Sequence, residues 1–271
     1  MKEKTKYVFV ILVYKNSSDL IECIESIENK VSSYRIIVVN AYYDDTTRAD
    51  VKKIAISHNC DFLDIENKGY SYGNNRGIEF ASNKYDYEYV IVSNPDIVIR
   101  EFDDSQLTSD FKYDIIAPEI IAASGKHQNP MAIRKNKWSE YLEYIGFRKK
   151  NTFLIYSGII VSKLSRWYYA KLRRIDSKPV YKIYEAHGSF VLLSHRAIAA
   201  LSPVYDEKMF LFAEEGVLAA KAKEMNLLTC FFSSICVNHK EDGSMKLSNI
   251  SVNEELRKAN IYYYESYVKN R

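Results

Sequence analysis

A chain of 271 residues with 47% hydrophobic and 27% charged residues is globular, and it is long enough for one large α/β domain or two small ones. The formal net charge of +3 is too small to indicate a nucleic-acid partner. The apolar run "YVFVILVY" (7–14) is much shorter than the roughly 20 residues that span a bilayer, so we expect a buried strand. With no secretory signal and no CxxC pair, the chain is expected in the cytoplasm with reduced thiols.

The first hundred residues alternate between strand-like and helix-like segments. Their apolar spacing predicts strands at 7–14, 34–42, 60–66 and 89–99, and helices at 17–30, 46–59 and 70–84. This order is typical of a parallel sheet with helices on both faces, in which ligands bind beyond the carboxyl ends of the strands. The strand at 89–99 carries Asn94, Pro95 and Asp96 near that end. Asp96 is therefore either an ordinary turn residue or a carboxylate at a ligand site.

The middle of the chain is basic. Between Ala132 and Lys182 there are 13 Lys and Arg against 3 Asp and Glu, a local charge of +10. The stretches "KNKWSEYLEYIGFRKKN" and "KLSRWYYAKLRR" mix Trp, Tyr and Leu with cations. That composition is typical of a segment that lies on an anionic membrane surface. The alternative is a solvated insertion whose aromatic side chains pack on the core or on a second subunit.

Six sequence motifs occur in an order that we interpret together. They are "VILVYKNSSDLIECIESI", "NKGYSYGNNRGIEFA", "VSNPDIVI", "HGSFVLLSHRAI", "MFLFAEEGVLAAKAKEMNL" and "VNHKEDGS". In this order they resemble the family 2 glycosyltransferases, which have the GT-A fold. The Asn-Pro-Asp form of the third motif resembles the rhamnosyltransferase-like branch, and "HQNP" at 127–130 resembles a branch linked to capsular polysaccharide synthesis.

The resemblance implies an α/β fold with a GT-A-like nucleotide-binding sheet flanked by helices and an acceptor-side extension. We expect a single domain over 1–271: a nucleotide-sugar half at 1–100, an acceptor half at 101–245 with the basic insertion at about 131–182, and a C-terminal helix at 246–271. The implied reaction is inverting transfer of a sugar from a UDP- or dTDP-linked donor to a growing surface glycan. The expected acceptor is lipid-linked, so the protein would work at the inner face of the cell membrane, as a monomer or a homodimer.

The third and sixth motifs supply the implied metal ligands, Asp96 and His239. A nucleotide-sugar donor leaves as a diphosphate, and a hard divalent cation such as Mn²⁺ or Mg²⁺ neutralises the charge that builds up on its oxygens. His239 could instead bind the diphosphate directly, or be an ordinary surface histidine.

The fifth motif supplies two adjacent acids, Glu214 and Glu215. An acceptor hydroxyl must lose its proton, and a carboxylate within hydrogen-bond reach can accept it. We expect Glu215 to be this base and Glu214 to bind the acceptor or to serve as an alternate base. Taken without the resemblance, the two acids would only complement the dipole at a helix start.

The remaining implied contacts belong to the donor and the acceptor. Members of the family usually end the second strand in an Asp that reads the nucleobase, but this chain has Asn40, which both donates and accepts hydrogen bonds. The nearest acid downstream that could replace it is Asp45. Further donor contacts are expected at Val13, Tyr14, Asn67, Gly69, Gly73, Asn74 and Asn94, and acceptor contacts at Gln128, Asn129, His187 and Gly188.

Two other functions stay open from the sequence. A sugar nucleotidyltransferase has a similar nucleotide-binding sheet, but "VYKNSSD" lacks its glycine-rich basic loop. A non-catalytic partner subunit is the second alternative, because Asn40 replaces the usual acid. Release of a nucleoside diphosphate without an acceptor would distinguish an enzyme from such a partner.

Overall fold

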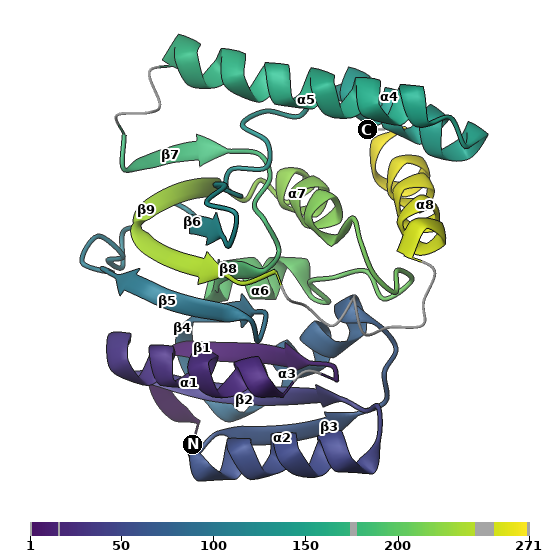
Figure 1. The fold of residues 1–271 in the computed structure, drawn as a ribbon. Coiled ribbons are helices and arrows are strands. Elements are labelled where there is room, and N and C mark those ends of the chain that lie inside the picture. The colour runs from purple at the N-terminus through teal and green to yellow at the C-terminus, as the bar shows by residue number, and fades with distance from the viewer. Residues whose placement is uncertain (1, 16, 174–177, 242–251, 270–271) are drawn as a thin grey trace.

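The computed structural model describes residues 2–15, 17–173, 178–241 and 252–269, and Figure 1 shows how their elements are arranged. The elements in the first half are β1 (Glu3–Val13), α1 (Ser18–Lys30), β2 (Tyr34–Ala41), α2 (Asp45–Ser57), β3 (Asp61–Ile65), α3 (Tyr70–Lys84), β4 (Tyr85–Ser93) and β5 (Ile97–Phe102). Those that follow are β6 (Ile115–Ala122), α4 (Lys137–Lys149), α5 (Thr152–Arg173), β7 (Val180–Ile183), β8 (Phe190–Ser194), α6 (His195–Leu201), α7 (Glu214–Glu224), β9 (Thr229–His239), α8 (Val252–Tyr263) and the π-helical turn η3 (Tyr264–Val268).

All described strands belong to one mixed sheet with the order β3-β2-β1-β4-β8-β6-β9-β5, and β7 pairs with β9. The first four strands of this order are parallel, as the sequence predicts. The acceptor half differs, because β8 pairs antiparallel with β4 and β6 pairs antiparallel with β8. The carboxyl ends of β1, β2 and β4 therefore meet at one edge, where a ligand can bind.

Side chains that alternate along the parallel strands fill two separate cores. In β1, Phe9 and Ile11 belong to the core that α1 and α2 cover, whereas Val8 and Val10 belong to the core that α3, α6 and α7 cover. Successive residues of a strand point to opposite faces, so a strand that is apolar throughout is buried on both. The glycines of α3 allow the helix to approach the sheet: a Cβ on Gly77 would lie 2.3 Å from a methyl carbon of Val10.

The strand predicted at 89–99 is two strands. It divides at Asn94–Asp96, and β5 continues from Ile97 as the antiparallel partner of β9 instead of extending β4. Pro95 has no N–H to donate to a ladder, which favours a break at this position.

The basic insertion forms a helical hairpin, α4–α5, that lies across one end of the molecule (Figure 1). Asn136 caps α4 by accepting from the N–H groups of Trp138 and Ser139. The C-terminal helix supports the hairpin: Tyr263 OH donates to Glu140 over 2.7 Å. The predicted C-terminal helix is confirmed from Val252 onward, while 246–251 and 270–271 lie outside the described residues.

Candidate functional site

The turn between β4 and β5 places Asp96 at the carboxyl edge of the parallel strands. Backbone hydrogen bonds fix the turn from both sides: Asn94 N–H donates to the Ser189 carbonyl over 2.8 Å, and Lys240 N–H donates to the Asp96 carbonyl over 3.1 Å. The Asp96 side chain is buried, with the whole residue only 3% exposed. A buried carboxylate is costly without a positive partner or a hydrogen-bond donor, so the surroundings of Asp96 must supply one.

His239 is the side chain that faces Asp96. The register of β5 and β9 pairs Ile97 with His239 and brings His239 Nε2 to 3.4 Å from Asp96 Oδ2. On its other side, His239 Nδ1 lies 2.8 Å from Gln128 Oε1, and Gln128 Nε2 donates to Glu241 over 2.9 Å. Because a carboxylate only accepts, Glu241 orients the Gln128 amide with its oxygen toward the ring. His239 Nδ1 therefore carries a hydrogen.

The pair of Asp96 and His239 fits a divalent cation. If the ring is neutral, the Nε2 lone pair points at a carboxylate oxygen, an arrangement that a cation between the two atoms stabilises. Mg²⁺ and Mn²⁺ accept oxygen and imidazole ligands, and one or two protein ligands suffice when phosphates and water complete the coordination. Within the described ranges, no group of three His, Cys, Asp or Glu side chains could hold a metal ion, so substrate oxygens would have to supply further ligands.

The paired acids lie at the start of α7 in different environments. Phe212 and Ala213 turn the chain into the helix with φ of 76° and 62°. Glu214 is buried, and burial together with the charge of Glu215 raises the pKa of Glu214 to about 8. Glu215 is half-buried, and its Oε1 accepts from the Gly188 N–H over 3.3 Å. At neutral pH, Glu214 therefore holds its proton, which leaves Glu215 as the member of the pair suited to accept one.

His187 and Gly188 connect the acids to the Asp96 turn. The His187 N–H donates to Asn129 Oδ1 over 2.8 Å, and the His187 ring lies edge-to-face with the His239 ring at 5.8 Å between centroids. Burial lowers the pKa of His187, which keeps its ring neutral. A Cβ on Gly188 would lie 3.0 Å from Glu215 Oε1, so the glycine makes room for the acid.

Gln128 and Asn129 act within the protein in this structure. The Gln128 amide joins Glu241 to His239, and Asn129 also donates to the Pro118 carbonyl over 2.8 Å. The side chains of Gln128 and Asn129 position His239 and His187. The acceptor contacts expected at Gln128 and Asn129 stay a prediction.

A third acid, the partly buried Glu185, lies beside the pair, and the sequence analysis missed it. Burial and the charge of Glu215 raise the pKa of Glu185 to about 8. Glu185 precedes the predicted acceptor motif by two residues, and no sequence pattern singles it out.

At the donor edge, Asn40 has an acid neighbour that the sequence analysis did not identify. The register of β2 and β3 pairs Asn40 with Asp64, and Asn40 Nδ2 donates to Asp64 Oδ1 over 2.7 Å. Asn40 Oδ1 is buried and has no hydrogen-bond partner among the residues that the structure describes. Asp45, which the sequence suggested as the replacement acid, instead pairs with Arg48 over 2.8 Å at the exposed start of α2. The acid beside Asn40 is thus Asp64, and the donor contact expected at Asp45 stays a prediction.

The other predicted donor residues fall into two groups. Val13 and Tyr14 lie at the end of β1, where the Tyr14 ring meets the Tyr43 ring edge-to-face and Lys15 Nζ lies 3.9 Å from the centroid of that second ring. The aromatic pair offers a surface for a base, and Tyr43 and Lys15 were not predicted to belong to it. Asn67 Oδ1 accepts from the Gly69 N–H over 3.2 Å just before α3.

Gly69, Gly73 and Asn74 serve packing in this structure. Gly69 has φ of 101°, and a Cβ there would lie 2.3 Å from the Phe210 carbonyl oxygen, so the conformation and the space both favour glycine. A Cβ on Gly73 would meet Leu12 at 2.4 Å, and Asn74 is fully buried. The close approach that the sequence predicts is thus to the protein's own backbone and sheet, and donor contacts at these three residues stay untested.

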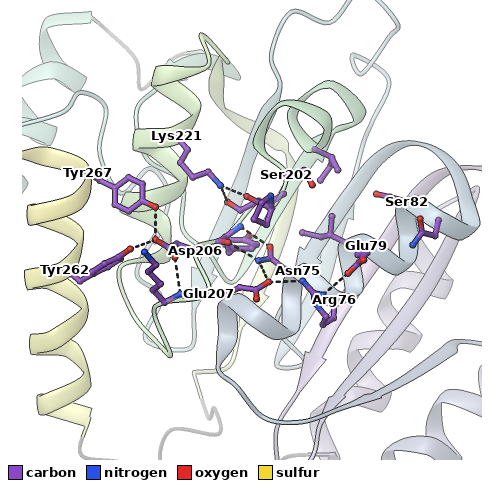
Figure 2. A pocket seen from close by; sticks show the side chains of 17 residues that line it. Asn75, Arg76, Glu79, Ser82, Ser202, Asp206, Glu207, Lys221, Tyr262 and Tyr267 are labelled. Carbon is purple, nitrogen blue, oxygen red and sulfur yellow. Dashed lines mark hydrogen bonds and ion pairs between the residues drawn. The ribbon is translucent and has the colours of Figure 1, made fainter. Parts of the chain in front are cut away.

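A cavity of about 970 Å³ between α3, the 202–208 segment and the C-terminal helix lies apart from these residues (Figure 2). Its polar groups pair with one another. Asp206 accepts from the hydroxyls of Tyr262 and Tyr267, and Glu207 accepts from Asn75 and Arg76. None of the predicted site residues lines the cavity. We interpret this cavity as part of the interface at which the C-terminal helix packs on the sheet domain.

Comparisons with known proteins concern the family and the fold of the chain. Residues 8–165 match the model of the family described as glycosyl transferase family 2. A low-salt glycan biosynthesis hexosyltransferase of Haloferax volcanii is 28% identical over 120 residues, which are 43% of this chain and 37% of that protein. Two crystal structures share the fold. GalNAc-T7 with UDP, GalNAc and Mn²⁺ has a TM-score of 0.60 and 12% identity over 87% of this chain and 44% of its own. S. aureus TarS has a TM-score of 0.55 and 11% identity over 97% of this chain and 44% of its own. The chain thus spans less than half the length of each.

The buried Glu214 makes stability depend on pH. Because its folded-state pKa of about 8 lies above the ordinary 4.5, the folded protein binds more protons than the unfolded chain between these two pH values. Stability from this group is therefore lost as pH rises from about 4.5 to 8. Glu214→Gln removes the titration and should raise the melting temperature at pH 8 but not at pH 4.5. Glu25→Gln on an exposed face of α1 serves as the control, and an equal gain at both pH values would contradict the assignment.

Proposed function

The chain belongs to glycosyl transferase family 2, and we propose that it transfers a hexosyl or deoxyhexosyl group from a nucleotide-sugar donor to a growing glycan with inversion. The observation that carries the proposal is the line of contacts from Asp96 through His239, His187 and Gly188 to Glu215. This line supports the proposal because it would join the binding site of the leaving diphosphate to the base that deprotonates the acceptor.

On the leaving-group side, Asp96 and His239 would hold Mn²⁺ or Mg²⁺. A bound cation would neutralise the charge that develops on the diphosphate as the glycosidic bond breaks. The protein's own contribution is to orient the two ligands: the β4–β5 turn fixes Asp96, and Gln128 fixes the ring of His239. Such supporting hydrogen bonds set both the tautomer and the direction of a histidine ligand.

On the acceptor side, Glu215 would accept the proton of the attacking hydroxyl. The Gly188 N–H holds its carboxylate, and Glu214 stays protonated beside it at neutral pH. A protonated Glu214 can donate a hydrogen bond to an acceptor oxygen without adding a second negative charge. In-line attack from this side, opposite the diphosphate, inverts the anomeric centre with a single base.

Asn40 and Asp64 would select the nucleobase of the donor. Asp64 accepts from the amide nitrogen of Asn40, which fixes the orientation of the amide and leaves its Oδ1 without a partner among the described residues. A buried oxygen without a partner is costly, and an N–H of the base would satisfy it. Uracil and thymine carry such an imide N–H, whereas cytosine has an acceptor at the same ring position. This supports a UDP- or dTDP-linked donor.

The acceptor is proposed to be a lipid-linked surface glycan. The hexosyltransferase relative is named for glycan biosynthesis, which supports this class of product. The Asn-Pro-Asp turn and the "HQNP" segment support the narrower rhamnosyltransferase-like and capsular readings. The family match disfavours a sugar nucleotidyltransferase, and the buried Glu214–Glu215 pair favours an enzyme over a non-catalytic partner subunit.

A membrane surface would present such an acceptor, and the α4–α5 hairpin is the proposed contact. Among the described helices, none has both the length and the apolar composition to cross a membrane. Large apolar side chains nevertheless line one face of α5 in exposed positions three to five residues apart, at Phe153, Tyr156, Ile160, Leu164, Trp167 and Leu172. That face and the local charge of +10 favour anionic lipid at the inner face of the cell membrane. A homodimer that covers the face is the alternative.

The first test concerns the base. Glu215→Gln keeps the shape and a hydrogen-bonding group but cannot accept a proton, so turnover should fall by about 10²- to 10⁴-fold. The dissociation constant of UDP should change less than about threefold. Release of UDP from a UDP-hexose is measured with water or glycan as the acceptor. Glu214→Gln is the matched control. It should reduce turnover less than Glu215→Gln does, and it should mainly weaken the binding of the acceptor. If neither change slows the reaction, the two acids only start a helix. If the protein releases neither UDP from a UDP-hexose nor dTDP from a dTDP-hexose, it is a partner subunit.

The second test concerns the base of the donor. An unsatisfied buried group costs about 1–3 kcal/mol, which corresponds to roughly 5- to 150-fold in affinity. UDP should therefore bind at least fivefold more tightly than CDP in titration calorimetry. Asp64→Asn frees the Asn40 amide to rotate, so the ratio of UDP affinity to CDP affinity should fall. The exchange Asn40→Asp with Asp64→Asn restores a fixed acceptor at position 40 and should restore the preference. A UDP to CDP ratio that none of these changes alters would exclude the Asn40–Asp64 pair as the selector.

A further inference from the structure

A second cavity, of about 790 Å³, lies where α5 and the 127–133 segment meet β7 and β9. Three cations line it: Lys163 and Arg166 from α5, and Lys178 just before β7. The Arg166 side chain is held in place because it donates to the Pro130 carbonyl over 2.9 Å. No residue that the structure describes places a carboxylate in an ion pair with any of the three.

Among the described residues, the single carboxylate in the lining of this cavity does not neutralise the three cations. Glu119 is the carboxylate in the lining, and it lies 2.6 Å from His127 Nδ1, which also lines the cavity. The three cations therefore remain available to an anion. Several cations in one concave site are an arrangement that binds phosphate groups, with Arg supplying paired donors.

The cavity is continuous with the apolar face of α5. Trp167 lines the cavity and is at the same time 62% exposed. Leu164, three residues before Trp167 on this face, is 60% exposed. The deeper wall is also aromatic, formed by Tyr181 and Phe231. A ligand that fits both parts has an anionic head and an apolar tail.

The cavity also borders the candidate catalytic site. His127, Asn129 and Pro130 line it, while Gln128 from the same segment holds His239, and Asn129 holds His187. One short segment thus separates the cations of this cavity from the histidines of the site. If a phosphate-linked glycan bound with its phosphate in the cavity, its sugar could extend past this segment toward the two histidines.

We propose that this cavity seats the diphosphate of a lipid-linked acceptor, with the lipid tail along the exposed face of α5. The inference rests on the proposed function and names the class of acceptor. The charge of the three cations favours the diphosphate over a zwitterionic headgroup, and the apolar face next to them favours a lipid over a free phosphate.

The test compares vesicles of matched surface charge. The full chain should bind neutral phosphatidylcholine vesicles that contain a few per cent of polyprenyl diphosphate at least tenfold more tightly than vesicles with charge-matched phosphatidylglycerol. Soluble pyrophosphate should compete, and added salt should weaken binding because it screens the cations. Replacing Lys163, Arg166 and Lys178 by Gln together should abolish the preference, whereas Lys149→Gln at the exposed end of α4 should leave it unchanged.

Folding and function are checked separately. The triple variant is used only if its melting temperature and UDP binding match those of the parent protein. Equal binding to both vesicle types would show surface attraction only, and binding to neither, with a dimer in sedimentation velocity, would assign the α5 face to a second copy. Both results would overturn the diphosphate seat while leaving UDP release from a UDP-hexose intact. If the parent protein itself releases no nucleoside diphosphate from its donor, that result would instead contradict the proposed function.

Discussion

The position of one buried carboxylate, Asp96, organises the rest of the candidate site. Its turn lies between a strand of the parallel half and a strand that crosses to the other end of the sheet, so both halves of the sheet constrain it. The Ser189 carbonyl holds one side of the turn, and the Lys240 N–H holds the other. A single register, Ile97 opposite His239, then decides which side chain faces the carboxylate. A shift of one residue would point His239 to the opposite face of the sheet.

Hydrogen bonds from outside the site orient the groups inside it. Glu241 orients Gln128, and Gln128 orients His239. Asn129, the next residue, fixes the backbone at His187. The 127–130 segment therefore supports both histidines, and a change in it should act on metal binding and on the acceptor side together. The same segment also forms a wall of the basic cavity under α5.

Local patterns in the sequence predict the elements well where one residue type determines one structure. The apolar run of β1 predicts a strand that is buried on both faces, as observed. The spacing of Leu20, Ile21, Ile24 and Ile27 predicts the buried face of α1, and all of these except Ile21, which is 40% exposed, are buried. The motif order also leads to Asp96, His239 and the paired acids, which the fold brings into one line. These predictions depend on residues that are close in sequence or on motifs that are specific in combination.

What the sequence does not predict depends on register and on pairs far apart in the chain. Asp64 lies beside Asn40 only because β2 and β3 align in one particular register, so proximity in sequence pointed to Asp45 instead. The bond between Gln128 and Glu241 joins residues 113 positions apart. Gly73 reads as a nucleotide-binding glycine in the sequence, which does not show that Leu12 fills the space beside it. In each case the structure adds a tertiary contact that sequence spacing does not show.

The central claim is that Asp96 and His239 hold the cation that binds the donor diphosphate. Titration calorimetry of UDP with Mn²⁺ and with EDTA tests it most directly, on the parent protein, on Asp96→Asn and on Asp110→Asn, which changes an exposed acid. The account predicts tighter binding of UDP with Mn²⁺ for the parent and for Asp110→Asn, and loss of most of that gain for Asp96→Asn. Equal affinity with Mn²⁺ and with EDTA in the parent protein, or an undiminished gain in Asp96→Asn, would contradict it.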